Sequence, residues 1–139
     1  MALTQMALDS LDFDATVALA ELVAPHVDIL EIGTPCIKHN GIKLLETLRA
    51  KFPNNLILVD LKTMDAGEYE AEPFYKAGAD ICTVLGSFIL VGTVIQPLAF
   101  LSKTAGLSPS YPIWTSSSQL RSSQPMVSIY FLRKGVSLL

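Results

Sequence analysis

The sequence has few cysteines, no segment long enough to cross a bilayer, and no acidic residue after Asp80. Its two cysteines, Cys36 and Cys82, cannot make a disulfide framework, and no Cys-x-x-Cys spacing suggests zinc. They are typical of small buried residues in a reducing cytosol. The longest apolar run, 88–101, is shorter than the roughly 20 residues that span a bilayer, and the first residues lack a signal-peptide pattern. We therefore expect a cytoplasmic protein with no membrane role.

Composition narrows the class of protein further. Half of the 139 residues are apolar, 17% are charged, and the formal net charge is −3. These values exclude a disordered chain and argue against nucleic acid as a partner. The length suits one ordinary domain, so a small enzyme or binding domain fits.

The charge is distributed unevenly along the chain. Residues 1–86 carry all 13 acidic groups and a net charge of −7, whereas residues 87–139 have a net charge of +4. The second segment is also rich in Ser and Pro and has no sustained period. We interpret 1–86 as the folded part and 87–139 as an irregular tail not shaped by the same fold. A disordered linker is the alternative interpretation of the tail.

The first segment repeats one pattern. Four short runs rich in β-branched residues predict strands, and three segments with apolar residues near helical spacing predict helices. The predicted strands are 3–9, 28–33, 56–62 and 80–86, and the predicted helices are 15–26, 42–52 and 68–79. This alternation is typical of parallel strands with right-handed crossovers. The sequence therefore predicts an α/β fold of about four βα units.

Each of the first three predicted strands ends in an acidic residue, namely Asp9, Glu31 and Asp60. Because equivalent ends of parallel strands converge on one rim, these carboxylates should share a mouth at the carboxyl edge of the sheet. Converging carboxylates repel one another, which raises their pKa unless a cation joins them. Hard oxygen ligands of this kind suit Mg²⁺, whose other positions go to water or substrate.

Lys62 follows Asp60 by two residues and should lie on the same strand face. An ammonium between Asp60 and Asp65 can stabilise an anion that forms on a bound substrate, or deliver a proton to it. The alternative is a surface salt-bridge cluster of little energetic value. His39, in a predicted loop after the second strand, is either a substrate contact or a polar loop residue. Gly33 is expected to serve a backbone turn.

Four motifs resemble the 3-hexulose-6-phosphate synthases, a family within the orotidine-monophosphate-decarboxylase superfamily of (β/α)8 TIM barrels. The motifs are ALD at 7–9, EIGTP at 31–35, VDLKTMDAG at 59–67 and AGADICTVLG at 77–86. They cover essentially all of residues 1–86, in order and at the family's spacing. The resemblance implies an aldehyde-lyase that condenses formaldehyde with ribulose 5-phosphate in the ribulose monophosphate pathway of formaldehyde assimilation.

The resemblance also implies roles for single residues. Glu31 and Asp60 would be ligands of Mg²⁺. Lys62 would be the electrostatic partner and proton donor beside an enediolate, and Asp9 would contact a substrate hydroxyl. Asp65 would reach across a homodimer interface into the neighbouring site. Glutamate rather than lysine at position 31 is a feature of the metal-dependent branch of the superfamily.

Two other functions remain open under this resemblance. A 3-keto-gulonate-6-phosphate decarboxylase belongs to the same metal-dependent branch, although TMDAG and TVLG favour the synthase. A non-catalytic fragment or interaction module is the third possibility. The family continues beyond position 86 with four more βα units, which supply its phosphate-binding loops, and none is recognisable in 87–139. The abrupt change at Ser87 resembles translation in a shifted frame that ends at a premature stop, so we expect the N-terminal half of a barrel.

Overall fold

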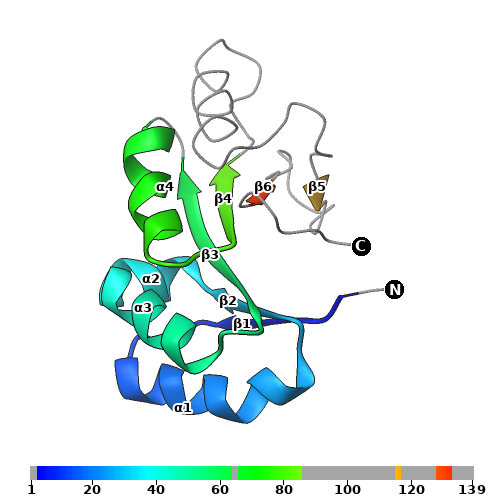
Figure 1. The fold of residues 1–139 in the computed structure, drawn as a ribbon. Helices are drawn as coiled ribbons and strands as arrows, with labels where there is room; N and C mark the ends of the chain where they lie inside the picture. Colours follow the sequence, from blue (N-terminus) through cyan, green and yellow to red (C-terminus); the bar gives the residue numbers. More distant parts are fainter. Residues whose placement is uncertain (1–2, 64–65, 86–114, 117–127, 133–139) are drawn as a thin grey trace, which may run out of the picture.

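Residues 3–63, 66–85, 115–116 and 128–132 are described by the computed structural model of the chain, and Figure 1 shows their arrangement. Strands and helices alternate as the sequence predicts. The parallel strands are β1 (Gln5–Leu8), β2 (Ile29–Ile32), β3 (Leu56–Thr63) and β4 (Ile81–Leu85). The helices are α1 (Phe13–Val23) with the 3-10 turn η1 (Ala24–His26), α2 (Thr34–Asn40), α3 (Ile42–Lys51) and α4 (Gly67–Lys76). The predicted α/β fold of four βα units is confirmed through β4.

The sheet is extended by two strands that the sequence pattern did not predict. Its order is β1-β2-β3-β4-β6-β5, with β6 (Ser128–Leu132) antiparallel to β4 and β5 (Thr115–Ser116) antiparallel to β6. Within the irregular tail, residues 115–116 and 128–132 thus form short strands. Pairing with β6 satisfies the backbone groups at the edge of β4, which an unpaired edge strand would leave open.

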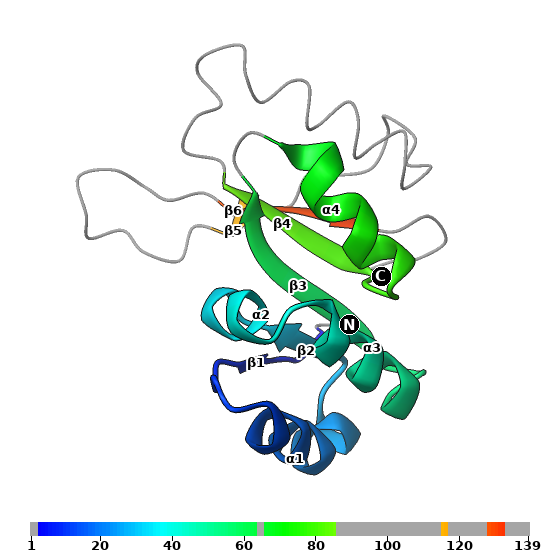
Figure 2. The ribbon, with the colours of Figure 1, turned by 90° about the vertical axis from the view of Figure 1, so that its left-hand side faces the viewer.

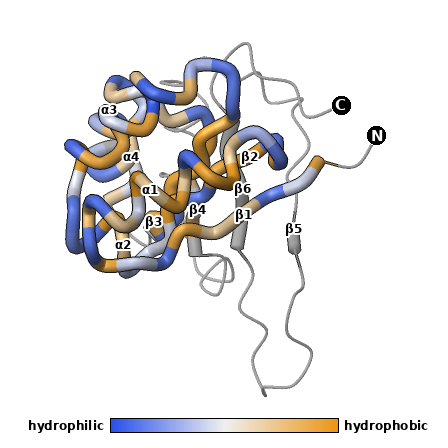
Figure 3. Tube along the Cα trace, turned by 90° about the horizontal axis from the view of Figure 1, so that it is seen from below, coloured by the Kyte–Doolittle hydropathy of each residue, from blue (hydrophilic) through white to orange (hydrophobic). Residues whose placement is uncertain are grey.

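One face of the parallel strands carries the apolar core. Leu8, Ile32, Val59 and Cys82 stand side by side in register across β1 to β4, and each is at most 1% exposed. They pack against buried helix residues, including Ala20, Cys36, Ile37, Leu44, Leu45 and Leu48. Figures 1 and 2 show the helices arranged around the strands, and Figure 3 shows how hydrophobic and hydrophilic positions alternate along them. Glu31 immediately precedes Ile32 on β2, and successive side chains of a strand point to opposite faces. The side chain of Glu31 therefore belongs to the face opposite to the apolar core.

Helix α2 replaces the loop that the sequence analysis predicted after the second strand. It begins at Thr34 with Pro35 in its first turn, a position where proline's missing N–H and fixed φ are tolerated. Seven residues are too few to show a helical period, so the sequence pattern did not reveal the helix. His39 lies on this helix and is exposed, so its placement in a loop is wrong.

The two cysteines are free and buried, as predicted. Burial raises the pKa of the Cys82 thiol to about 12, so that it stays protonated and behaves as a small apolar side chain. None of the helices in the described part of the chain has both the length and the apolar character needed to span a bilayer.

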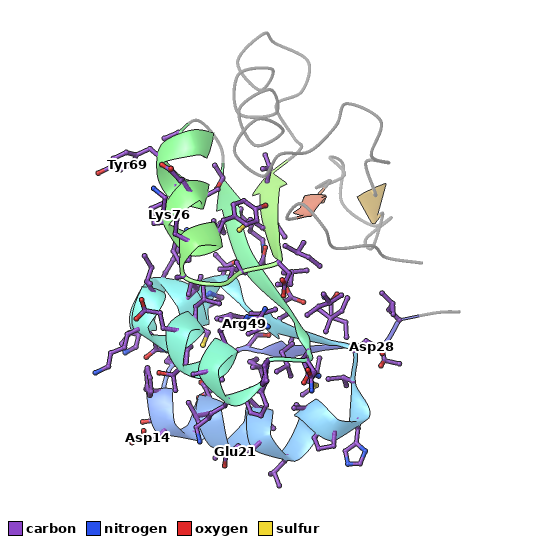
Figure 4. All side chains as sticks on the ribbon, viewed as in Figure 1. Asp14, Glu21, Asp28, Arg49, Tyr69 and Lys76 are labelled. Carbon is purple, nitrogen blue, oxygen red and sulfur yellow. The ribbon has the colours of Figure 1, made fainter. Side chains whose placement is uncertain are left out.

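Arg49 ties together the edge of the sheet where β3 and β4 begin. From α3, its Nε donates to the carbonyl of Gly78 at 2.9 Å and its Nη1 to the carbonyl of Asn55 at 3.0 Å. Its Nη2 forms an ion pair with Asp80, whose Oδ2 also accepts from the backbone N–H of Ile57 at 2.9 Å. Figure 4 shows Arg49 among the elements that it joins. The Arg49–Asp80 ion pair is thereby surrounded by backbone partners. It lies at the amino edge of the sheet, opposite to the carboxyl edge where the sequence predicts the cluster of carboxylates.

Gly78 makes this arrangement possible. Its φ of 109° is in the region that favours glycine, and a Cβ there would lie 2.7 Å from Cγ of Arg49. The sequence analysis predicts the end of a helix here, and α4 does end two residues earlier, at Lys76.

We expect Arg49→Met to lower the free energy of unfolding by about 2 to 3 kcal/mol, because it leaves the Asp80 carboxylate largely buried without its cation. The control is Lys76→Met, which breaks the Lys76–Glu72 pair of 2.7 Å on α4, where the lysine side chain is 73% exposed. Such exposed pairs contribute little, so the control should unfold like the unchanged chain. Urea unfolding of the three proteins checks this, and equal losses in both variants would contradict the role given to Arg49.

Candidate active site

Asp60 is the centre of a polar cluster on β3. The residue is only 7% exposed, and both of its carboxylate oxygens accept hydrogen bonds. Oδ2 accepts from Nζ of Lys62 and from Oγ1 of Thr34, the latter at 2.7 Å, and Oδ1 accepts from Oγ1 of Thr83 at 2.6 Å. The hydrogen-bond partners of this one carboxylate therefore come from β3, β4 and α2. A buried charge needs such partners, and here it has a cation and two hydroxyl groups.

These partners decide the protonation state of Asp60. Burial alone would raise the pKa of this carboxyl group, but the hydrogen bonds from Lys62, Thr83 and Thr34 and the charge of Lys62 outweigh it. The net effect is a pKa below the ordinary value for aspartate. Asp60 is therefore ionised at neutral pH although it is buried.

Lys62 reaches Asp60 through an unusual backbone. Its φ is 49°, and no other non-glycine residue in the described ranges has a positive φ. The pairing of β3 with β4 changes register between Val59 and Thr63, which marks a β-bulge around Lys62. Its Nζ donates to Oγ1 of Thr34 at 2.8 Å as well as to Asp60. The predicted proximity of Asp60 and Lys62 is present, but a bulge and not a regular period of two produces it.

Glu31 lies on the neighbouring strand, on the face opposite to the helices. Its Oε2 accepts from Nε2 of Gln5 at 2.5 Å. Burial raises the pKa of Glu31, the charges of Asp60 and Asp9 raise it further, and the Gln5 hydrogen bond and the charge of Lys62 only partly offset these effects. The mutual repulsion expected of converging carboxylates is therefore present at this edge.

Asp9 directly follows β1 and lies over Gly33. A Cβ at Gly33 would stand 1.8 Å from Oδ1 of Asp9 and 3.3 Å from the carbonyl oxygen of Leu8. Gly33 connects β2 to α2, and its φ is an ordinary −62°, so the backbone conformation itself does not require a glycine. Glycine is needed at this position for space, and a larger residue would have to move the Asp9 carboxylate.

The structure brings Asp9, Glu31, Asp60 and Lys62 to one edge of the sheet. Asp60 is not the last residue of its strand, because β3 continues to Thr63. Asp65 lies outside the described residues, so its predicted role stays a prediction. A cavity of about 510 Å³ between α2 and α4 is bordered by Lys62 but not by Glu31 or Asp60, and it is therefore a separate feature.

Sequence reasoning missed the neutral partners Gln5, Thr34 and Thr83. The position of Thr83 follows once the register of β3 and β4 is known. Leu58 pairs with Ile81, so Asp60 and Thr83, each two residues further along, belong to the same face of adjacent strands. A threonine opposite a buried aspartate is a natural hydrogen-bond donor to it.

Glu31 and Asp60 form a donor set that fits Mg²⁺. A carboxylate offers about four lone-pair positions, and Asp60 uses three of them, two on Oδ2 and one on Oδ1. Its Oδ1 therefore retains acceptor capacity, and a cation would relieve the repulsion that Glu31 experiences from Asp60 and Asp9. In the described ranges no group of three or more His, Cys, Asp or Glu residues is placed to hold a metal ion. A site with two carboxylates suits Mg²⁺, which keeps several water or substrate ligands.

Parallel βα units with a carboxylate and lysine cluster at the carboxyl edge of the sheet are typical of β/α-barrel proteins. In agreement, the model of the orotidine 5′-phosphate decarboxylase/HUMPS family matches residues 3–96, and the chain belongs to this family. Over 86 aligned residues it is 95% identical to 3-hexulose-6-phosphate synthase of Methylomonas aminofaciens, an alignment that covers 62% of this chain and 41% of the relative. The chain thus spans less than half the length of the curated relatives that it matches.

Solved structures of two enzymes have the same fold. A crystal structure of 3-hexulose-6-phosphate synthase is 40% identical with a TM-score of 0.68, covering 76% of this chain and 48% of that one. The 3-keto-L-gulonate-6-phosphate decarboxylase of Vibrio cholerae is 35% identical, also with a TM-score of 0.68, covering 75% and 46%. Both likenesses extend over about half of the solved chain, in keeping with the partial match to the curated relatives.

Glu31→Gln should make the chain more stable at pH 7 in the absence of divalent cations. A raised carboxyl pKa means that ionised Glu31 is disfavoured in the folded chain, so its contribution to stability is lost as the pH rises through the folded pKa. Glutamine keeps the shape and the contact with Gln5 but removes the repulsion. The gain should vanish as the pH falls below the ordinary range of glutamate, as measured by urea unfolding across pH.

The matched control is Glu46→Gln, on the exposed side of α3. It should produce no comparable gain. A Glu31→Gln protein that is less stable than the unchanged chain at pH 7 would show that repulsion among the carboxylates does not dominate at this edge.

Proposed function

We propose that this chain carries the carboxylate and lysine part of the active site of an aldol-type lyase, which condenses formaldehyde with ribulose 5-phosphate to 3-hexulose 6-phosphate. The observation that carries the proposal is the contact between Asp60 and Lys62, in which a buried carboxylate stays ionised beside an ammonium group. The identity of 95% to a 3-hexulose-6-phosphate synthase over 86 residues supports the choice of reaction.

The reaction makes a demand that Lys62 can meet. In an aldol addition a carbon of the ketose gives up a proton to a base, which leaves an enediolate. The enediolate carbon forms a bond with the carbon of formaldehyde, whose C=O π bond breaks, and the resulting alkoxide takes up a proton. Negative charge therefore develops on substrate oxygen. The Lys62 ammonium favours that charge electrostatically, and its Nζ carries a proton that can be transferred. Asp60 and Thr34 hold the Nζ in place through their hydrogen bonds.

In this proposal Glu31 and Asp60 would hold a Mg²⁺ ion. The ion would act as a Lewis acid that polarises substrate oxygen. The support from this chain is the acceptor capacity left on Asp60 and the repulsion at Glu31. Gln5 orients Glu31 from the neighbouring strand, as partners outside the metal's own ligands commonly do.

Asp9 and Asp65 complete the proposed site. The Asp9 carboxylate is exposed at the mouth, where it is accessible to a substrate hydroxyl. For Asp65, the proposed position in the neighbouring site of a homodimer rests on the family resemblance alone.

A decarboxylase acting on 3-keto-L-gulonate 6-phosphate is the second candidate. Its support is the TM-score of 0.68 to such an enzyme, which equals that to the synthase. The same lysine would then stabilise the anion left by loss of carbon dioxide. The substrate decides between the two.

Purified chain should consume formaldehyde only when ribulose 5-phosphate and Mg²⁺ are both present, and Asp60→Asn and Lys62→Met should each lower kcat by about 10² to 10⁴. Lys38→Met, an exposed lysine on α2, is the control. Turnover of 3-keto-L-gulonate 6-phosphate instead would support the decarboxylase. A folded chain that turns over neither substrate would make it a non-catalytic member of the family.

Mg²⁺ alone should raise the unfolding temperature of the chain, because an ion that binds only the folded state stabilises it by mass action. Glu31→Gln and Asp60→Asn should each abolish the increase, and Glu46→Gln should retain it. Thermal unfolding at several Mg²⁺ concentrations, with a chelator as reference, measures this without substrate. An equal increase in all variants would mean that the ion binds elsewhere.

A further inference from the structure

The geometry points to Thr83 as the positioning residue of this site: one hydroxyl group fixes the Asp60 carboxylate and the left-handed backbone of Lys62 together. The inference rests on the proposed function for its catalytic meaning, but the contacts themselves belong to the chain alone. Thr83 lies on β4 and is 2% exposed. Its hydroxyl contacts Asp60 and Lys62, so any effect on the proposed site would be exerted through these two residues.

The hydroxyl of Thr83 uses its donor and one of its acceptor positions. It donates to Oδ1 of Asp60 at 2.6 Å and accepts from the backbone N–H of Lys62 at 3.1 Å. A hydroxyl has one donor and two lone pairs, so both bonds form at once without competition. The side chain of one strand is therefore bonded to both a side chain and the backbone of its neighbour.

The bulge in β3 explains why such a bond is needed. Register between β3 and β4 is lost between Val59 and Thr63, so regular pairing does not hold Lys62 in place. A lysine with a φ of 49° persists only where its surroundings overdetermine that conformation. Thr83 supplies a backbone anchor at the amide, while Asp60 and Thr34 anchor the ammonium at the other end of the residue.

Thr63 provides a matched comparison on the same pair of strands. It follows Lys62 directly, stands opposite Val84, and is 1% exposed. Its hydroxyl has no hydrogen-bond partner among the described residues. Removing this hydroxyl should therefore leave the backbone of Lys62 unchanged, whereas removing that of Thr83 should release it.

Amide hydrogen exchange, measured by NMR on the full chain without substrate, tests the inference. The amide of Lys62 should exchange about five to ten times faster in Thr83→Val than in the unchanged chain, since the substitution removes one hydrogen bond and keeps the shape. Thr83→Ser, which retains the hydroxyl, should preserve slow exchange, and so should Thr63→Val. The amide of Ile57, bonded to Asp80 at the other end of β3, is the internal reference and should not change.

Contrary results are equally clear. Fast exchange at Lys62 in the unchanged chain overturns the inference, and so does equal exchange in Thr83→Val and Thr83→Ser. Acceleration of Lys62 and Ile57 together would show that Thr83 only supports the fold. Should Thr83→Val fail to fold, Thr83→Cys replaces it: its weak S–H donor predicts exchange between that of the serine variant and that of an unprotected amide.

A second measurement addresses the functional meaning. In Thr83→Val, Mg²⁺ affinity measured by calorimetry should fall about tenfold or more, and kcat should fall more than KM rises, with Thr83→Ser restoring both. An affinity unchanged by Thr83→Val would overturn the positioning role toward Asp60. If the unchanged chain neither binds Mg²⁺ nor turns over substrate, the proposed function fails, and exchange at Lys62 still decides whether Thr83 holds the bulge.

Discussion

A carboxylate buried in an apolar sheet must be paired and hydrogen-bonded, and the carboxyl edge of this protein is built around that requirement at Asp60. Its cation comes from Lys62, two residues away, and bringing the ammonium back to the carboxylate involves a bulge and a left-handed backbone. Two more acceptor positions take hydroxyl groups from α2 and β4. Because these elements also form the core, the position of the charge pair and the packing of the helices depend on each other.

Each edge of the sheet has a buried aspartate, and the two aspartates differ in their partners. At the amino edge, Asp80 is engaged by Arg49 and by the backbone of Ile57, and the arginine also donates to loop carbonyls. That arrangement joins segments together and presents nothing reactive. At the carboxyl edge, Asp60 retains acceptor capacity and neighbours Glu31, whose charge is disfavoured. The buried aspartate at the amino edge thus holds segments together, whereas the one at the carboxyl edge, where β/α barrels commonly have their active sites, keeps an acceptor position.

The sequence was sufficient for features that depend on local pattern. The apolar runs at 28–33 and 56–62 fall on β2 and β3, and the acidic positions at their ends lie together because parallel strands impose it. Helix α2 escaped prediction because seven residues carry no period. The left-handed conformation of Lys62 escaped because a bulge depends on the partner strand, and Thr83 became visible only with the register. No pattern distinguishes a glycine kept for space, such as Gly33, from one kept for a turn.

Strand β6 gives the chain a property that concerns assembly rather than chemistry. In a closed β/α barrel the free edge of β4 would receive a parallel neighbour, but here β6 runs antiparallel along it from Ile81 to Leu85. The hydrogen-bonding groups of that edge are already in use. A separate polypeptide that carried the second half of a β/α barrel would therefore not simply dock on β4. It would have to displace β6 in a strand exchange. The rate of this exchange would be limited by how fast β6 dissociates from β4.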